Sequence, residues 1–318
     1  VQNDPDTSEL HFALGNLFRR RGEYDRAVRV HEHLLARADL STADRQRAQH
    51  GLALDFLKAG LLDRAEDALR KLEGSPYEGQ ARLARLAIYE RSREWPQAAQ
   101  VAEMLERSGE ANFSVRQAHY RCEQAREAFS KGDLDDALTL LQDTVRDIPQ
   151  APRARILLGQ LLLTRQQAPQ CLQVLRPLFE QADPTAPLAA VTLAKAAQAC
   201  GQEALARQLL QGFYDRQASL DVLEALVSLG GPGAAETRQP FLQHLQKNAS
   251  LLAASRWLAA APAQEAVPPA VQKALDTAAR PLARYRCAAC GFEAKEHFWH
   301  CPGCQAWDSY PPRRVEEL

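Results

Sequence analysis

A motif that recurs about every 35 residues constrains the fold of this chain more than any other feature. In its clear copies a glycine stands five residues before an alanine: Gly22 and Ala27, Gly60 and Ala65, Gly132 and Ala137. Weaker copies keep the same frame: Arg93 and Ala98, Gln166 and Cys171, Gly201 and Ala206. The successive offsets are 38, 33, 39, 34 and 35 residues. Such a period predicts stacked helical units, because one unit alone cannot bury its apolar face.

The segments between these motifs have the pattern of paired helices. Apolar residues recur at spacings of three and four, which gives each helix one buried stripe, as in Leu134, Leu138, Leu141 and Val145. The motif glycine is expected to end the first helix of a pair in a left-handed turn. Small residues, where the two helices meet, are Gly15, Gly159 and Ala194, and the large residues that follow in the frame are Phe18, Phe56, Tyr89 and Leu162. Strand signals are nearly absent before residue 280, so the fold class is all-α; the alternative is a helical bundle without repeats.

These positions resemble the tetratricopeptide-repeat family over about residues 8–215, with Pro149 where the consensus closes a repeat. We therefore predict a superhelical solenoid of about six tetratricopeptide repeats over residues 1–215. Residues 216–280 are predicted to add further helices, either a degenerate repeat or a cap, followed by a connector. A breaker is expected at residues 230–233 and a last short helix at about 270–279.

Four cysteines lie within 18 residues, in two pairs: Cys287-x2-Cys290 and Cys301-x2-Cys304. Two such pairs can place four thiolates at the corners of a tetrahedron, which predicts one metal ion, zinc or iron, in a module over residues 281–318. The Cys-Pro-Gly-Cys segment resembles a rubredoxin knuckle, and the short insert between the pairs resembles a zinc ribbon. His297 and His300 are alternative ligands, although four sulfurs already complete a closed structural site. A module this small depends on its metal for most of its folding free energy.

The rest of the composition argues against several classes of function. The chain has 39 basic and 40 acidic residues, and residues 281–318 have five of each, so nucleic-acid binding is not expected. No P-loop, G-x-S-x-G, dinucleotide fingerprint or H-E-x-x-H motif occurs, so we predict a protein that is not an enzyme. Cys122, Cys171 and Cys200 are expected to be buried free thiols, because isolated cysteines do not form a disulfide framework.

The whole chain resembles the lipopolysaccharide assembly protein B family of Gram-negative bacteria. The resemblance rests on the order of the repeat array and the four-cysteine module, on the segment Trp299–Trp307 and on the repeat sequence Asp55–Glu66. It implies an adaptor on the cytoplasmic side of the inner membrane, anchored by an N-terminal transmembrane helix. Because the first residue is Val1 and not Met, that anchor is expected upstream. It further implies that the FtsH protease, the lipid A pathway deacetylase and an inner-membrane sensor protein are partners, and that the adaptor promotes degradation of the deacetylase.

A superhelix presents the first helix of each pair along a concave groove, which suits a partner peptide or helix. The residues predicted to face this groove are Phe12, Asn16, Arg19, His50, Leu54, Leu57, His119, Arg126 and Phe129. The carboxylate clamp of chaperone-binding tetratricopeptide proteins is not matched, since Phe12 and Gln80 stand at its lysine positions and only Asn16 agrees. A general scaffold or co-chaperone remains the alternative function, and a redox protein with rubredoxin-type iron is a third.

Overall fold

The computed structural model describes residues 5–109, 111–230, 234–262 and 265–318, and the chain in it forms two compact units. The first unit ends at Tyr120 and the second begins at Arg121. This boundary lies inside the predicted array, within α7 (Ser114–Lys131).

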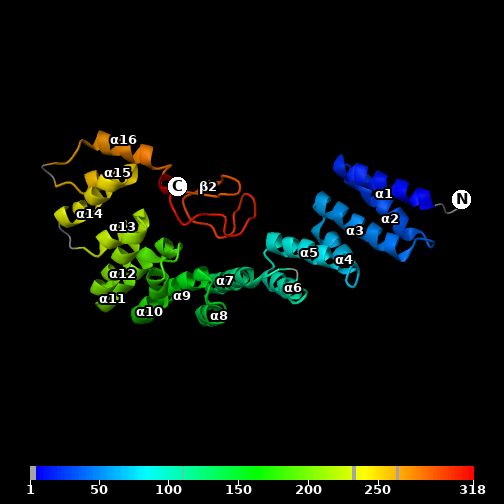
Figure 1. The fold of residues 1–318 in the computed structure, drawn as a ribbon, viewed down its shortest axis with the longest axis horizontal. Coiled ribbons are helices and arrows are strands. Elements are labelled where there is room, and N and C mark those ends of the chain that lie inside the picture. The colour runs from blue at the N-terminus through cyan, green and yellow to red at the C-terminus, as the bar shows by residue number, and fades with distance from the viewer. Residues whose placement is uncertain (1–4, 110, 231–233, 263–264) are drawn as a thin grey trace. The chain divides into compact units, whose positions relative to one another are not determined.

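The first unit is built of antiparallel helix pairs, drawn in blue and cyan in Figure 1. Its helices are α1 (Pro5–Arg20), α2 (Tyr24–Ala36), α3 (Thr42–Ala59), α4 (Leu62–Arg70), α5 (Glu78–Ser92), α6 (Trp95–Arg107) and the start of α7. Neighbouring helices pack in chain order, α1 on α2, α2 on α3 and α3 on α4, as in a stacked repeat.

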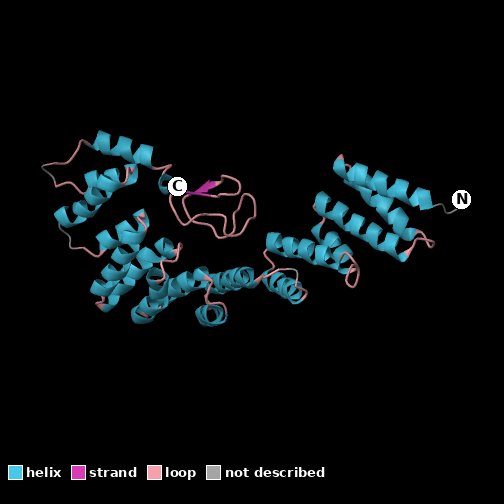
Figure 2. Ribbon diagram, in the orientation of Figure 1, coloured by secondary structure: helices cyan, strands magenta, loops and turns pink. Residues whose placement is uncertain are grey.

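The second unit continues the helix pairs and then adds the cysteine module. Its helices are the rest of α7, α8 (Leu134–Asp147), α9 (Pro152–Thr164), α10 (Ala168–Glu180), η1 (Ala186–Ala189), α11 (Ala190–Cys200), α12 (Glu203–Arg216), α13 (Leu220–Ser228), α14 (Ala234–Lys247), α15 (Leu251–Ala259) and α16 (Pro269–Ala279). The module contains β1 (Tyr285–Arg286), β2 (Glu293–Ala294) and η2 (Val315–Glu317). β1 and β2 are antiparallel, with Tyr285 opposite Ala294. Figure 2 shows that, apart from this small hairpin and the loops, the described residues are helical, which confirms the predicted fold class.

All six repeat positions have the left-handed backbone that the motif predicts. The φ angles are 77° at Gly22, 75° at Gly60, 90° at Gly132 and 68° at Gly201. The two copies without glycine, Arg93 and Gln166, have φ of 60° and so adopt the same turn at a steric cost. The weak copies therefore belong to the same frame as the clear ones.

The small residues allow helices to approach closely, as predicted. A Cβ atom added to Gly15 in α1 would lie 2.6 Å from Cε1 of His31 in α2. One added to Gly159 in α9 would lie 2.7 Å from Cδ2 of Leu175 in α10. The large residues of the frame, Phe18, Phe56, Tyr89 and Leu162, are all buried.

Cys122 and Cys171 are buried free thiols, whereas Cys200 is only partly buried. Residues 231–233 of the predicted breaker lie outside the described residues. Within the described ranges, no helix is both long enough and apolar enough to cross a bilayer.

Candidate metal centre

The four predicted ligands come together on two matching knuckles in the second unit. The Sγ atoms of Cys287, Cys290, Cys301 and Cys304 all lie within 4.8 Å of one another. In each knuckle the amide of the first cysteine donates to a carbonyl five residues later, Cys287 to Phe292 and Cys301 to Ala306, at 2.9 Å. The residue after each second cysteine has a left-handed backbone: Gly291 with φ of 77° and Gln305 with φ of 62°. This geometry fits one tetrahedral metal ion held by four sulfurs.

The electrostatics of the cluster favour a cation. Burial raises the pKa of Cys287, but hydrogen bonds with the Ser309 hydroxyl and with the amides of Cys290 and Ala289 outweigh it and lower the pKa to about 6. The Phe292 amide lowers the pKa of Cys290, yet burial and the three neighbouring sulfurs raise it to about 12. Several thiolates so close together cannot all ionise without a counter-charge, and a bound metal supplies one.

The two histidines of the module do not join the ligand set. His297 is surrounded by the rings of Tyr285, Trp299 and Tyr310, with centroids 5.0–6.0 Å away. Its Nε2 lies 2.9 Å from the Tyr310 carbonyl, and burial lowers its pKa. His300 stacks on Trp307, and its Nε2 lies 2.9 Å from the Gln305 carbonyl. Among the described residues, the four cysteines are the only cluster with the geometry of a metal site.

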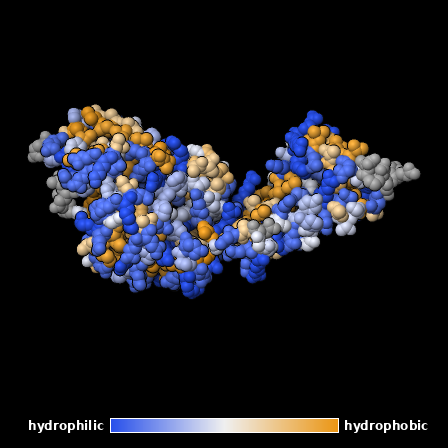
Figure 3. All heavy atoms as spheres, in the orientation of Figure 1, coloured by the Kyte–Doolittle hydropathy of each residue, from blue (hydrophilic) through white to orange (hydrophobic). Residues whose placement is uncertain are grey.

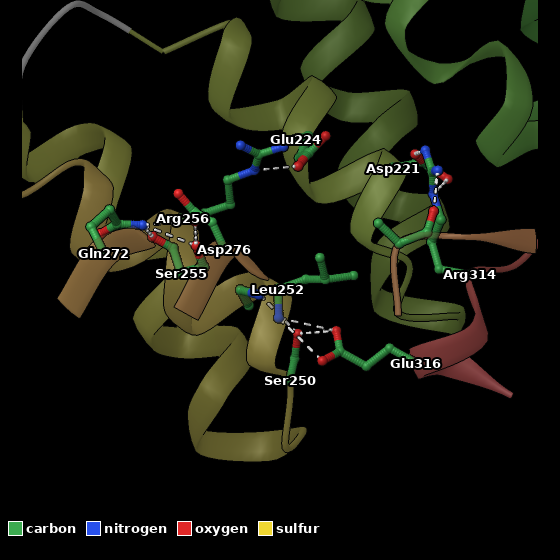
Figure 4. Close-up of polar contacts among 12 residues, drawn as sticks. Asp221, Glu224, Ser250, Leu252, Ser255, Arg256, Gln272, Asp276, Arg314 and Glu316 are labelled. Carbon is green, nitrogen blue, oxygen red and sulfur yellow. Dashed lines mark hydrogen bonds and ion pairs between the residues drawn. The ribbon is translucent and has the colours of Figure 1, made fainter. Parts of the chain in front are cut away.

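The module lies inside the curve formed by α9 to α16 (Figure 1) and packs against several of them. Trp299 contacts the core of the second unit, and the guanidinium of Arg153 in α9 lies 6.0 Å from its ring centroid. Arg314 donates to both carboxylate oxygens of Asp221 in α13, at 2.6 and 3.1 Å (Figure 4). Its guanidinium also stacks on Tyr285, 4.4 Å from the ring centroid. The sequence singles out neither Arg153 nor Asp221, and Asp221 and Arg314 show no local pattern that predicts their pairing.

The residues predicted to face a groove are divided between the two units: seven lie in the first, and Arg126 and Phe129 lie in the second. The structure buries Phe12 and His119, with 2% and 3% of their surface exposed, so neither side chain offers area to a partner. Asn16, His50, Leu54 and Leu57 are half-buried. Arg126 and Phe129 are exposed.

Arg19, also predicted for the groove, takes part in a buried polar cluster. Its guanidinium donates to Asp55 at 2.8 Å and to the Asn16 amide oxygen at 2.5 Å. The other oxygen of Asp55 lies 2.5 Å from Nδ1 of His31, and both of these side chains are almost fully buried. Gly15 and Gly51 leave the space that the His31 ring occupies. The cluster therefore joins α1, α2 and α3.

Comparisons with known proteins agree with this fold and this site. The family described as "Rubredoxin metal binding domain" matches residues 285–311, and families described as "Tetratricopeptide repeat" match residues 10–46 and 128–182. The "Lipopolysaccharide assembly protein B" of Escherichia coli strain K12 is 30% identical, covering 99% of this chain and 83% of that protein. The Haemophilus influenzae protein of the same name is 26% identical, covering 97% and 80%. Among solved structures, the C-terminal part of a tetratricopeptide-repeat protein from Cytophaga hutchinsonii is 13% identical, with a TM-score of 0.41, covering 79% of this chain and 96% of that one.

The fold and the cysteine cluster define a class: tetratricopeptide-repeat scaffolds that carry a C-terminal rubredoxin-like metal module. The E. coli match extends over almost all of this chain and most of its relative. The chain belongs to the lipopolysaccharide assembly protein B family, which confirms the resemblance predicted from the sequence.

Proposed function

We propose that the chain is a non-enzymatic adaptor on the cytoplasmic side of the inner membrane. It limits lipopolysaccharide synthesis by presenting the lipid A pathway deacetylase to the FtsH protease, and an inner-membrane sensor protein opposes it. The observation that carries this proposal is the family match over 99% of the chain. A metal centre closed by four sulfurs, which leaves no open coordination position for a substrate, also supports a role in binding over one in catalysis.

The first unit offers the surface for a partner. On α1, Leu10, Leu14 and Leu17 are 68%, 39% and 49% exposed, at the spacing of one helix face. On α5, the next-but-one pair, Leu83 is 46% exposed. Figure 3 shows apolar surface over the part of the first unit where α1 lies. Exposed leucines on the first helices of the pairs suit the apolar side of a partner helix or peptide.

The test uses the full-length protein in cells that lack their own copy. We expect it to restore normal turnover of the deacetylase and to recover FtsH or the deacetylase from solubilised inner membranes. The double variant L14S/L17S should lose recovery of the partner while its unfolding free energy changes by less than about 0.5 kcal/mol, because both side chains are exposed.

The matched control is Leu61→Ser, which removes an exposed leucine from the turn between α3 and α4. It should recover partners as the unaltered protein does. Recovery of chaperones or unrelated assemblies in place of FtsH and the deacetylase would favour the general scaffold. Visible absorption of an iron–thiolate centre with a reversible potential would favour the redox alternative.

A further inference from the structure

Two consecutive carboxylates near the end of the second unit cap two helices of different pairs. Glu317 accepts a hydrogen bond from the Leu220 amide, at the start of α13, with Oε1 2.6 Å from the nitrogen. Glu316 accepts from the Ser250 hydroxyl at 2.7 Å and from the amides of Leu251 and Leu252 at the start of α15 (Figure 4). Carboxylates at these positions satisfy amides that lack a partner within their own helix and complement the helix dipole.

The α13 cap has no local substitute. Ser219 holds the N-cap position, yet its side chain makes no capping hydrogen bond and its buried hydroxyl has no partner. Both α13 and α15 have only nine residues, a length at which a helix depends on its surroundings to form. The order of the first turn of α13 therefore depends on the residues that bring Glu317 to it. At α15 the Ser250 hydroxyl also accepts from the Ala253 amide at 2.9 Å, and Glu316 adds to this local cap.

The same segment is fixed to the cysteine knuckles at its other end. The Ser309 carbonyl accepts from the Ala288 amide at 2.7 Å, and the Ser309 hydroxyl lies 3.2 Å from Sγ of Cys287. Tyr310 is 3% exposed, and its hydroxyl donates to the Phe292 carbonyl at 3.1 Å.

The fully buried apolar core of the module is Tyr285, Cys287, Cys301 and Tyr310, of which two are metal ligands. Without the metal, little holds the knuckles that position Ser309 and Tyr310.

We propose that residues 309–318 form a strap whose closure is controlled by the metal. While the four cysteines hold their ion, the strap is fixed to the knuckles at Ser309 and Tyr310 and to α13 by the ion pair of Arg314 with Asp221, and its two carboxylates occupy the starts of α13 and α15. Loss of the ion removes the attachment at the knuckles and so loosens the strap, which makes the order of the last helix pairs depend on metal loading. By linkage, the docked strap must in turn tighten metal binding, although neither glutamate touches the ion. This proposal concerns the second unit alone and holds whichever partner the first unit binds.

Hydrogen exchange of the full chain, measured by mass spectrometry, tests the first half of the proposal. Removal of zinc with a chelator should lower the protection of amides in residues 219–228 and 250–259 by about tenfold, within the usual range of coupling between two sites. The amides of α3, in the first unit, should keep their protection. Unchanged protection of residues 219–228 and 250–259 in the metal-free chain would overturn the proposal.

Equilibrium competition for zinc with a chromophoric chelator tests the second half. The double variant E316A/E317A should bind zinc about tenfold more weakly than the unaltered chain. The matched control is Glu224→Ala, which breaks the exposed ion pair with Arg256, 3.0 Å long, between the same two helices. A double variant that binds zinc as tightly as Glu224→Ala does would contradict the strap. If the double variant does not fold, the exchange experiment on the unaltered chain decides the question.

Discussion

The first helices of the repeat pairs have different surroundings in the two units. In the first unit, α1 and α5 leave leucines exposed, and a buried cluster of Arg19, His31 and Asp55 ties the pairs together from inside. In the second unit, α9, α13 and α15 contact the cysteine module or the strap that follows it. The first helices of the pairs thus leave leucines at the surface in one unit, and in the other they are contacted by a segment of the same chain.

The largest effect is expected when the module in the second unit loses its metal. Cys301→Ser eliminates one of four ligands at a fully buried position, and structural metal sites contribute about 10–16 kcal/mol in zinc-finger peptides. We expect the metal content to fall to near zero and control of the deacetylase to be lost, while circular dichroism shows that the repeats stay helical. Cys200→Ser, outside the module, should keep one metal per chain. Full metal occupancy in Cys301→Ser would refute the assignment of the ligands.

A substitution in the buried polar cluster should destabilise the first unit and leave the second unit unchanged. Asp55→Ala leaves the buried His31 and the guanidinium of Arg19 without their carboxylate. Removing one partner of a buried ion pair costs about 3–5 kcal/mol. Denaturant unfolding monitored by hydrogen exchange in α1 to α3 should show this loss of stability. Metal binding should be unchanged. Asp63→Ala, at an exposed position in α4, should change stability by less than about 0.5 kcal/mol. An equal loss in both variants would show that the buried cluster has no special role.

Acidification should weaken metal binding in the second unit. At pH 7 the thiol of Cys287, with its pKa lowered to about 6, is already ionised, whereas those of Cys290 and Cys304, with raised pKa values, keep their protons. Metal binding then displaces at least two protons, so the apparent affinity should fall about 100-fold per pH unit, and more steeply below pH 6, as Cys287 also gains its proton. Competition with a chelator from pH 8 to 5.5 measures this slope. A slope of one proton or less would contradict the assigned protonation states.

The smallest expected effect is on stability and comes from substitutions at one left-handed turn in each unit. Arg93 and Gln166 are exposed and have φ of 60°, so Arg93→Gly and Gln166→Gly should each stabilise their own unit by about 0.5–1 kcal/mol, after the greater entropy of the unfolded glycine is subtracted. Gly22→Ala, at φ of 77°, should destabilise the first unit. Thermal unfolding of the three variants checks the signs. A destabilised Arg93→Gly would mean that its side chain makes contacts that outweigh the backbone strain.

The sequence predicted the features that depend on short, regular spacing. The six turns follow from one repeated frame, and the metal ligands follow from paired cysteines whose geometry is set within a few residues. It did not predict the burial of Phe12 and His119, because the position of a residue on a helix face does not say how deeply neighbouring helices cover it. It also missed Asp221, Glu316 and Glu317, whose partners are 64 to 97 positions away, with no periodic signal between them.

That separation has a consequence for the order in which the protein is made. The amide of Leu220 cannot donate to the carboxylate of Glu317 until that residue, 97 positions later, has been synthesised. A ribosome adds about 5–20 residues per second, so this helix start stays uncapped for roughly 5–20 s after it is synthesised. The first unit, whose contacts join neighbouring pairs, can fold as it emerges. The start of α13 is therefore open to chaperones and proteases during that interval.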